Sequence, residues 1–370
     1  MMQDVCYIGS QPGNPRNSEG AFLSLQDGRI IFIYTRYDGH DPEDNANADL
    51  ALIESADDGL TWPKAPRIIF SRGKADNIMS VSLLRLHSGR IMLVYLEKFT
   101  SPDGELHCVP YITFSDDETA TWTTPRLLLP DSGYHVVCND RLVQLSTGRI
   151  IVPVSPWVEL ESPDRKKVMG MTFFLSDDEG ATWRLSKDYL YPPENVRALQ
   201  EPGVLELTDG RLWTWARTSS NYQFGCYSSD GGETWGEVKP LMDFCSPLSP
   251  MSVKRNPVSQ RLTAVWNDHQ PRWNVPVPIR KIPSYRWKEC KTAGRTPFVL
   301  AESDDEGKSW QATLLEDDPK RGFGYTAMHF TGTALLLGYC CGGLNGTMML
   351  QDLKLRRIPC DPATGCLNFD

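Results

Sequence analysis

The residues in this sequence that could take part in chemistry are carboxylates, arginines and tyrosines rather than metal ligands. One loop, residues 38–49, holds four aspartates that could do acid–base work. No two of the ten cysteines have C-x-x-C spacing. Neither do the six histidines form a His-x-x-x-His or comparable pair: His40, His87, His107, His135, His269 and His329. The sequence therefore predicts no metal site and no bound cofactor.

The charge of the chain indicates what kind of partner it could bind. There are 38 lysines and arginines against 47 aspartates and glutamates, a net charge of −9. A surface that binds nucleic acid usually has a basic excess, so we predict no nucleic-acid partner. An acidic small substrate would have to be captured by local arginines. Nothing in the sequence indicates the oligomeric state.

The apolar segments and the cysteines indicate in which cellular compartment the protein could reside. The longest apolar stretches, such as residues 30–34 and 335–339, are far shorter than the ~20 residues that cross a bilayer, so no membrane span is predicted. Residues 1–5 lack the features of a secretion signal, and we expect a cytoplasmic protein, although a chain whose leader had been removed would look the same. The scattered cysteines favour reduced, mostly buried thiols.

An eight-residue pattern, Ser-x-Asp-x-Gly-x-x-Trp, recurs along the chain. Its five copies begin at Ser55, Ser115, Ser176, Ser228 and Ser303. The second copy has Thr119 in place of the glycine. Asp and Gly allow a tight reversal, the Ser and Asp oxygens can bind turn amides, and Trp can pin the turn onto its sheet. The pattern predicts structural turns that carry no chemistry.

A second repeat lies out of phase with the first and consists of alternating apolar residues broken by a turn. Its six copies begin at Ala21, Ser82, Asp140, Pro202, Ser252 and Tyr325. Each copy predicts a hairpin of two inner strands. Six hairpins, five of them followed by an Asp turn, predict one all-β domain of residues 1–370, a six-bladed β-propeller of four-stranded sheets. A strand from the opposite terminus, residues 5–8 or 353–358, should close the sixth sheet.

The turns resemble the Asp boxes (BNR repeats) of the sialidase, or neuraminidase, superfamily, and together with the hairpins they cover nearly the whole chain. The resemblance implies a site in which three arginines clamp a substrate carboxylate, a tyrosine paired with a glutamate is the nucleophile, and an aspartate is the general acid and base. Guanidinium groups suit the clamp because they stay charged and offer paired donors. A neutral tyrosine becomes a nucleophile only when a carboxylate takes its proton.

The resemblance implies which arginines bind the substrate. The family's first arginine lies in an Arg-Ile-Pro motif before the first hairpin, and Arg16 holds the matching position, although the Ile-Pro is absent. Arg36, at the end of that hairpin, resembles another substrate-facing position. Arg217 and Arg295 match the second and third clamp arginines. Surface positions are the alternative for Arg16 and Arg36. Two other arginines are less well placed as the third: Arg280 and Arg286.

The family's acid/base aspartate precedes the strand that leads to the first Asp box, typically as Asp-x-x-x-x-Asp. Asp44 and Asp49 reproduce that spacing, so the resemblance implies that Asp44 is the acid/base. A solvated acidic loop is the alternative. The other candidates for the role are Asp41, Asp49 and Asp76.

Two further residues match the nucleophile and its activator. Glu201 begins the hairpin that ends with Arg217, as the tyrosine-activating glutamate of the family does, and Tyr325 begins the sixth hairpin, where the family has its nucleophile. A structural ion pair of Glu201 with Arg217 and a core tyrosine are the alternatives. We also expect three residues at or near inner-strand starts to line the sugar pocket: Asn77, Asn139 and Arg141.

The sequence therefore predicts a retaining glycoside hydrolase, similar to exo-α-sialidases, that releases a terminal sialic acid or a related acidic sugar from a glycan. Two alternatives remain, a non-catalytic glycan-binding propeller and a hydrolase or lyase for a uronic-acid glycan. An enzyme requires Tyr325 and Glu201 within hydrogen-bond reach, roughly 2.6 to 3.2 Å, whereas a binding module predicts that they are separated.

Overall fold

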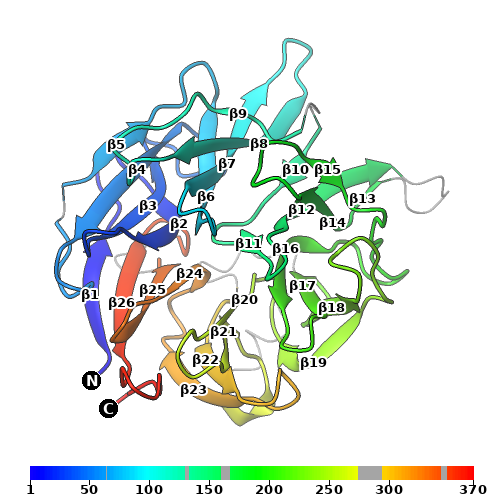
Figure 1. Cartoon of the computed structure of the whole chain (residues 1–370). Helices are drawn as coiled ribbons and strands as arrows, with labels where there is room; N and C mark the ends of the chain where they lie inside the picture. The colour runs from blue at the N-terminus through cyan, green and yellow to red at the C-terminus, as the bar shows by residue number, and fades with distance from the viewer. Residues whose placement is uncertain (64, 130–132, 160–166, 274–293, 343–347) are drawn as a thin grey trace.

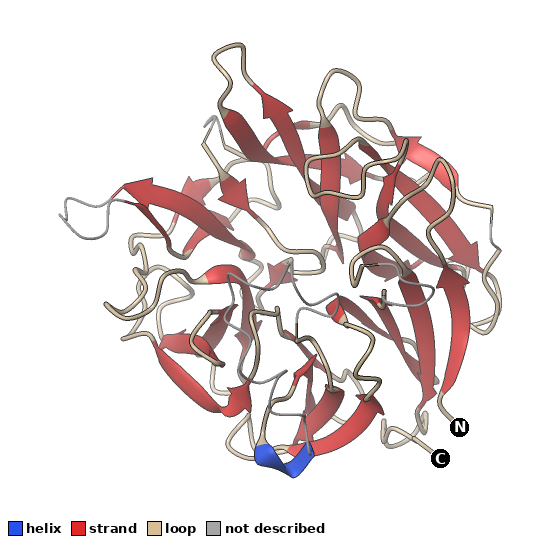
Figure 2. Cartoon of the chain, turned by 180° about the vertical axis from the view of Figure 1, so that it is seen from behind, coloured by secondary structure: helices blue, strands red, loops and turns tan. Residues whose placement is uncertain are grey.

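The computed structural model describes residues 1–63, 65–129, 133–159, 167–273, 294–342 and 348–370. Within these ranges the chain is almost entirely β-structure, and one short 3-10 helix, η1 (Pro271–Trp273), interrupts it. No helix among these residues is long and apolar enough to cross a membrane. The sheets surround a common centre, which makes the protein an all-β propeller (Figure 1). Figure 2 shows from behind that strands dominate that face as well.

Three of the sheets have four antiparallel strands each. One contains β16 (Gln200–Glu206), β17 (Leu212–Arg217), β18 (Tyr222–Ser228) and β19 (Lys239–Cys245). The next contains β20 (Ser252–Arg255), β21 (Leu262–Asn267), β22 (Phe298–Ser303) and β23 (Gln311–Glu316). The third has the order β24 (Gly324–Phe330), β25 (Ala334–Cys340), β26 (Leu353–Pro359) and β1 (Gln3–Ile8). Both terminal segments that the sequence offered as alternatives are therefore used, β26 as the third strand and β1 as the edge.

The remaining strands form two larger sheets. The eight-stranded sheet contains β2 (Asn17–Ser24), β3 (Ile30–Tyr37), β4 (Ala48–Ser55), β5 (Arg67–Phe70), β6 (Asn77–Arg85), β7 (Ile91–Thr100), β8 (Leu106–Ser115) and β9 (Arg126–Leu127). The six-stranded sheet contains β10 (His135–Val136), β11 (Val143–Gln144), β12 (Ile150–Glu159), β13 (Lys167–Met169), β14 (Thr172–Ser176) and β15 (Arg184–Leu185).

The sheets differ in number from the sequence prediction. The described residues form five hydrogen-bonded sheets rather than six separate four-stranded ones. The difference arises because β2–β5 and β6–β9, two antiparallel runs, are joined by one parallel bridge between Ala48 and Asn77. A bridge of one residue pair leaves no trace in the periodicity of a sequence.

The Asp boxes form the turns that the sequence predicts. In the first box, the Ser55 hydroxyl donates to Asp57 (2.7 Å), the amide of Gly59 donates to Ser55 Oγ (3.0 Å), and the Trp62 indole donates to the Gly59 carbonyl (3.1 Å). Thr119, which replaces glycine in the second box, has a φ of 70°. Its backbone therefore has a left-handed conformation that glycine adopts more easily.

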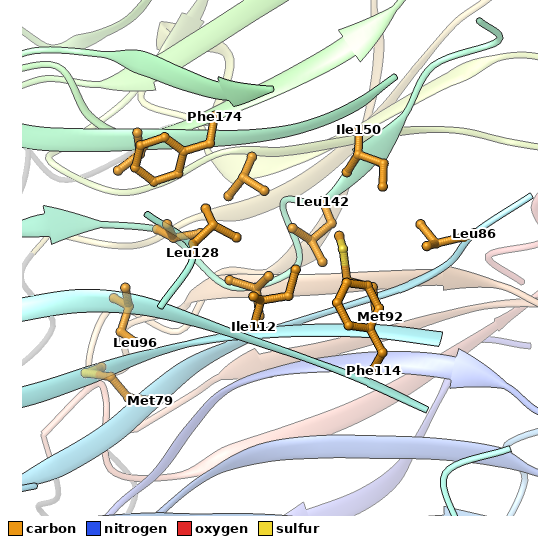
Figure 3. Packing of buried hydrophobic residues seen from close by; sticks show 14 of the residues in the cluster. Met79, Leu86, Met92, Leu96, Ile112, Phe114, Leu128, Leu142, Ile150 and Phe174 are labelled. Atoms are coloured by element: carbon orange, nitrogen blue, oxygen red, sulfur yellow. The ribbon is translucent and has the colours of Figure 1, made fainter. Parts of the chain in front are cut away.

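The hydrophobic core lies between neighbouring sheets. One cluster joins residues of β6, β7 and β8 to residues of β12 and β14, and its members include Met92, Ile112, Ile150 and Phe174 (Figure 3). A second cluster joins β2, β3 and β4 to β25 and β26. Each sheet thus buries its faces against its neighbours, which holds the inner strands and the residues at their starts in fixed positions.

Candidate active site

Four residues of this region lie near the starts of inner strands, where the chain bulges. The pairings of β2, β6, β16 and β24 with the next strand each shift in register near their first residues. Glu19, Ser80, Glu201 and Tyr325 lie in these shifts with φ between 48° and 58°. Such left-handed backbone is costly for a non-glycine residue and a bulge re-aims its side chain. The four side chains form two contacting pairs. Glu19 on β2 contacts Ser80 on β6, and Glu201 on β16 contacts Tyr325 on β24.

Glu201, Tyr325 and Arg217 form one hydrogen-bonded group. The Tyr325 hydroxyl donates to Glu201 Oε1 at 2.9 Å. Arg217 Nη1 lies 3.0 Å from Glu201 Oε2 and donates to the Tyr325 hydroxyl oxygen at 3.1 Å. Burial raises the pKa of Tyr325 well above its ordinary value, and the cations of Arg217 and Arg295 only partly oppose this. The phenol is therefore protonated at neutral pH, with its proton directed at a carboxylate that can accept it.

Arg295 completes this side of the site. Its guanidinium lies over the Tyr325 ring, 5.2 Å from the centroid. The residue is only 7% exposed, and neither Nε nor Nη1 has a hydrogen-bond partner within the described residues. A Cβ at Gly324 would lie 3.3 Å from Nη1, so this glycine leaves room for the guanidinium. A buried cation with unused donors can bind an anionic ligand.

Arg16 and Asp44 form a second charged group. Arg16 Nη1 lies 2.5 Å from Asp44 Oδ1, and the guanidinium stacks over the Tyr37 ring at 4.6 Å. Arg16 is buried, whereas 61% of the Asp44 side chain is exposed. Desolvation would raise the pKa of Asp44, but the cations of Arg16 and Lys98 outweigh it and hold that pKa well below its ordinary value. Asp44 is therefore ionised at neutral pH.

The other acids considered for the role of Asp44 have different partners. Asp41 accepts the amide of Glu43 at 2.9 Å. Asp49 accepts the amide and guanidinium of Arg72, at 2.9 and 3.2 Å. Asp76 accepts the amide of Thr100 at 2.8 Å. Asp41, Asp49 and Asp76 thus bind backbone amides or Arg72. Among the four candidate aspartates, Asp44 is the one that pairs with Arg16.

The remaining sequence candidates lie in three different settings. Asn77 donates to the Ala46 carbonyl at 2.6 Å and so holds the loop that carries Asp44. Asn139 donates to the backbone carbonyls of Gly20 and Tyr325, at 2.9 and 3.2 Å, and joins two bulges. Arg36, on β3, is partly exposed, and its side chain makes no hydrogen bond or ion pair with another described residue. Arg280 and Arg286, the alternatives to Arg295, lie outside the described residues.

Arg141 lies apart from the other candidates. It donates to Ser252 Oγ (3.0 Å) and to the Met251 carbonyl (2.8 Å), and it lines a cavity together with Leu84 and Arg255. Leu84 and Arg255 lie at the ends of β6 and β20, whereas Glu201 and Tyr325 lie at the starts of β16 and β24. The structure therefore brings Arg16, Asp44, Glu201, Arg217, Arg295 and Tyr325 to one end of the inner strands, whereas Arg141 lines a cavity that extends to the other ends of β6 and β20.

The sequence prediction missed three buried polar residues in this region, Glu19, Ser80 and Lys98. Glu19 binds Ser80 Oγ and lies 3.4 Å from Arg16 Nη2. Burial raises the pKa of Glu19, and Arg16 and Ser80 only partly oppose this. Lys98 donates to the Asp44 carbonyl at 3.0 Å. Glu19 could have been found, because Glu19-Gly20 occupies the same place in the first hairpin as Glu201-Pro202-Gly203 in the fourth.

The chain was compared with known proteins. An anhydrosialidase from Macrobdella decora is 31% identical over 235 residues, 58% of this chain and 27% of that protein. A sialidase from Clostridium perfringens is 25% identical over 246 residues, 59% of this chain and 59% of that protein. The aligned region thus spans less than two thirds of each relative. A solved leech intramolecular trans-sialidase, complexed with 2,7-anhydro-Neu5Ac, shares the fold with a TM-score of 0.69 at 15% identity, over 96% of this chain and 70% of that one.

A family model extends the comparison over most of the propeller. The model of the BNR repeat-like domain matches residues 64–337, well over half of the chain. That range includes four of the five Asp boxes and both Glu201 and Tyr325. The chain therefore belongs to the BNR repeat-like domain family.

Proposed function

We propose that this protein is a retaining exo-α-sialidase-like glycoside hydrolase, which releases a terminal sialic acid or a related acidic sugar from a glycan. The observation that carries the proposal is the contact of the Tyr325 hydroxyl with Glu201 at 2.9 Å, beside Arg217 and Arg295. The similarity to proteins named sialidase and anhydrosialidase supports it. In this proposal the eight-stranded sheet is two blades, so that residues 1–370 form a single six-bladed propeller.

The proposed first step forms a covalent bond between the enzyme and the sugar. Arg16, Arg217 and Arg295 bind the substrate carboxylate, and Arg36 and Asn77 stand near it. Tyr325 attacks the anomeric carbon while Glu201 takes the phenol proton, and the bond to the leaving oxygen breaks. A tyrosine suits this attack because an anionic carboxylate nucleophile would be repelled by the acidic sugar. Water then attacks the same carbon, the bond to Tyr325 breaks, and the released phenolate takes its proton back from Glu201, so the anomeric configuration is retained.

Asp44 has to hold a proton in order to protonate the leaving oxygen. In the free protein its short contact with Arg16 keeps it ionised. A substrate carboxylate that binds Arg16 would weaken this contact, and the substrate would also exclude water from Asp44. Both changes raise the pKa of a carboxyl group. Asp44 could then donate its proton to the leaving oxygen and later accept one from the attacking water.

A second candidate activity shares the covalent step. One relative is named an anhydrosialidase, and a structure with the same fold contains 2,7-anhydro-Neu5Ac. In such a reaction a hydroxyl of the bound sugar, rather than water, would displace Tyr325. A glycan-binding module without catalysis would not require the Tyr325–Glu201 contact, and a uronic-acid glycan would place a different acid on the same arginines.

The test measures turnover of a fluorogenic sialoside and of a fluorogenic uronide. It compares the unmodified chain with two variants, Tyr325→Phe and Asp44→Ala. Tyr191→Phe, at a 48% exposed tyrosine, is the matched control. We expect sialoside cleavage that both site variants abolish and the control retains. NMR of the products would separate free sialic acid from its anhydro form. Cleavage of the uronide alone would show that the substrate is a uronic-acid glycan. Binding of sialic acid without any turnover would refute the proposal that the protein is an enzyme.

A further inference from the structure

Three side chains form a row beside Asp44, on strands that the mechanism above does not use. Lys98 on β7 lies directly opposite Cys108 on β8 in the antiparallel register. Cys108 also forms a parallel bridge with Tyr134, the residue before β10. Residues directly opposite each other on neighbouring strands point to the same face of a sheet. Lys98, Cys108 and Tyr134 therefore share one face.

That face is turned toward the site. Lys98 Nζ donates to the Asp44 carbonyl at 3.0 Å and to Asn45 Oδ1 at 3.3 Å. At the other end of the row, burial raises the pKa of the Tyr134 phenol, and Cys108, Asp44 and Glu201 each raise it further. The register of Lys98 with Cys108 and the bridge of Cys108 to Tyr134 thus connect the phenol to the loop that carries Asp44. Tyr134 is partly buried and packs against the hydrophobic cluster that contains Met92 and Ile112.

Tyr134 has the properties of a sugar-binding residue. Its hydroxyl makes no hydrogen bond with another described residue, so it can bind a ligand. An aromatic ring covers the apolar face of a sugar, and a phenol can bind one of the sugar's hydroxyls. The carboxylates of Asp44 and Glu201, which both act on the Tyr134 phenol, would repel a second anion. The row therefore suits a neutral sugar better than an acidic one.

We infer that Tyr134 binds the leaving group of the substrate, a neutral sugar, and determines which glycans the enzyme cleaves. The inference rests on the proposed function, in which Asp44 protonates the leaving oxygen and must therefore face it. The acidic sugar occupies the side of Arg217 and Arg295, whereas the leaving sugar extends from Asp44 along the row of Lys98, Cys108 and Tyr134. Tyr134 acts on the substrate by contact and takes no part in proton transfer.

The test compares substrates that differ only in their leaving group. Steady-state kinetics would be measured with an aryl sialoside and with 3′-sialyllactose, and free sialic acid would be used as a competitive inhibitor. We expect Tyr134→Ala to lower kcat/KM about tenfold for sialyllactose while the inhibition constant of sialic acid changes by less than about twofold. Tyr134→Phe keeps the packed ring and should show a smaller loss of about threefold that is also limited to sialyllactose. Tyr191→Ala is the control for loss of an exposed tyrosine and should change none of these values.

The possible failures are distinguishable. Equal losses for sialyllactose and for sialic acid inhibition would place Tyr134 in the acidic-sugar pocket or in the core and overturn the inference. Unchanged kcat/KM for sialyllactose in both Tyr134 variants would also overturn it. If the unmodified chain cleaves neither sialoside, the proposed function itself fails, and the inference fails with it. If Tyr134→Ala does not fold, Tyr134→Phe still decides between these outcomes.

Discussion

Replacing Glu201 by glutamine tests the central contact of the site with the smallest change in shape. Glu201 Oε1 accepts the Tyr325 hydroxyl at 2.9 Å, and Oε2 lies 3.0 Å from Arg217 Nη1. A glutamine amide can keep one of these contacts but cannot take the phenol proton. Because burial already raises the pKa of Tyr325, the phenol would have no base strong enough to activate it.

These contacts allow the loss of activity and of stability in Glu201→Gln to be estimated. Loss of a general base typically lowers kcat about 10²- to 10⁴-fold, and we expect Glu201→Gln to fall in that range. KM should change by less than about threefold, because the arginines that bind the substrate carboxylate remain. The buried Arg217 loses its anionic partner but keeps its contact with Gln200 (3.2 Å), so the free energy of unfolding should fall by up to about 3 kcal/mol.

The measurement is kcat and KM for a fluorogenic sialoside, together with urea unfolding of each variant. Glu206→Gln is the matched control, because Glu206 lies on the same strand and its carboxylate binds only Ser146 among the residues described, at 2.7 Å. This control should keep its full kcat. A folded Glu201→Gln variant with kcat within about tenfold of the unmodified protein would refute the role of Glu201 as the base for Tyr325.

Three further predictions concern the clamp, the acid loop and a turn. Arg295→Ala should raise KM for the sialoside about ten- to hundredfold, because a charge-assisted contact with the substrate is lost. The melting temperature should not fall, because two buried donors of Arg295 have no partner among the described residues. An unchanged KM would show that Arg295 is not part of the clamp. The pKa of Asp44 is lowered on folding, so its pair with Arg16 stabilises the protein above the ordinary aspartate pKa of about 3.9, and this contribution is lost as the pH falls through the lower folded value. Asp44→Asn should therefore lower the free energy of unfolding at pH 7 and have progressively less effect below about pH 4, which urea unfolding at a series of pH values would measure. Thr119→Gly should raise the free energy of unfolding by about 1 kcal/mol, because the φ of 70° favours glycine; a decrease in thermal unfolding measurements would contradict this.

The sequence was most informative where structure depends on neighbouring residues. Each Asp box is closed by contacts within eight residues, such as Ser55 with Asp57 and Trp62 with Gly59, so its spacing alone predicted the turn. The hairpins were visible for the same reason. Cysteines predicted to be buried thiols also are, among them Cys108, Cys138 and Cys340.

Contacts between distant parts of the chain could be predicted only in part. Tyr325 and Glu201 are 124 positions apart, and only their resemblance to a known arrangement placed them together. The pairing of Glu19 with Ser80 depends on two left-handed bulges, and the position of Tyr134 depends on one bridge to Cys108. Arg141 stands where the repeat suggested a sugar-pocket residue, but its guanidinium binds Ser252 and Met251, a partnership that only the packed structure reveals.

The pairing of β1 with β26 has a mechanical consequence. Gln3 lies opposite Arg357 and Ile8 lies opposite Leu353, so the free ends of these two antiparallel strands lie side by side (Figure 1). A force that pulls the two ends apart would break their hydrogen bonds one after another, rather than all at once as in a sheared pair. The ring of sheets should therefore open first at this seam under tension.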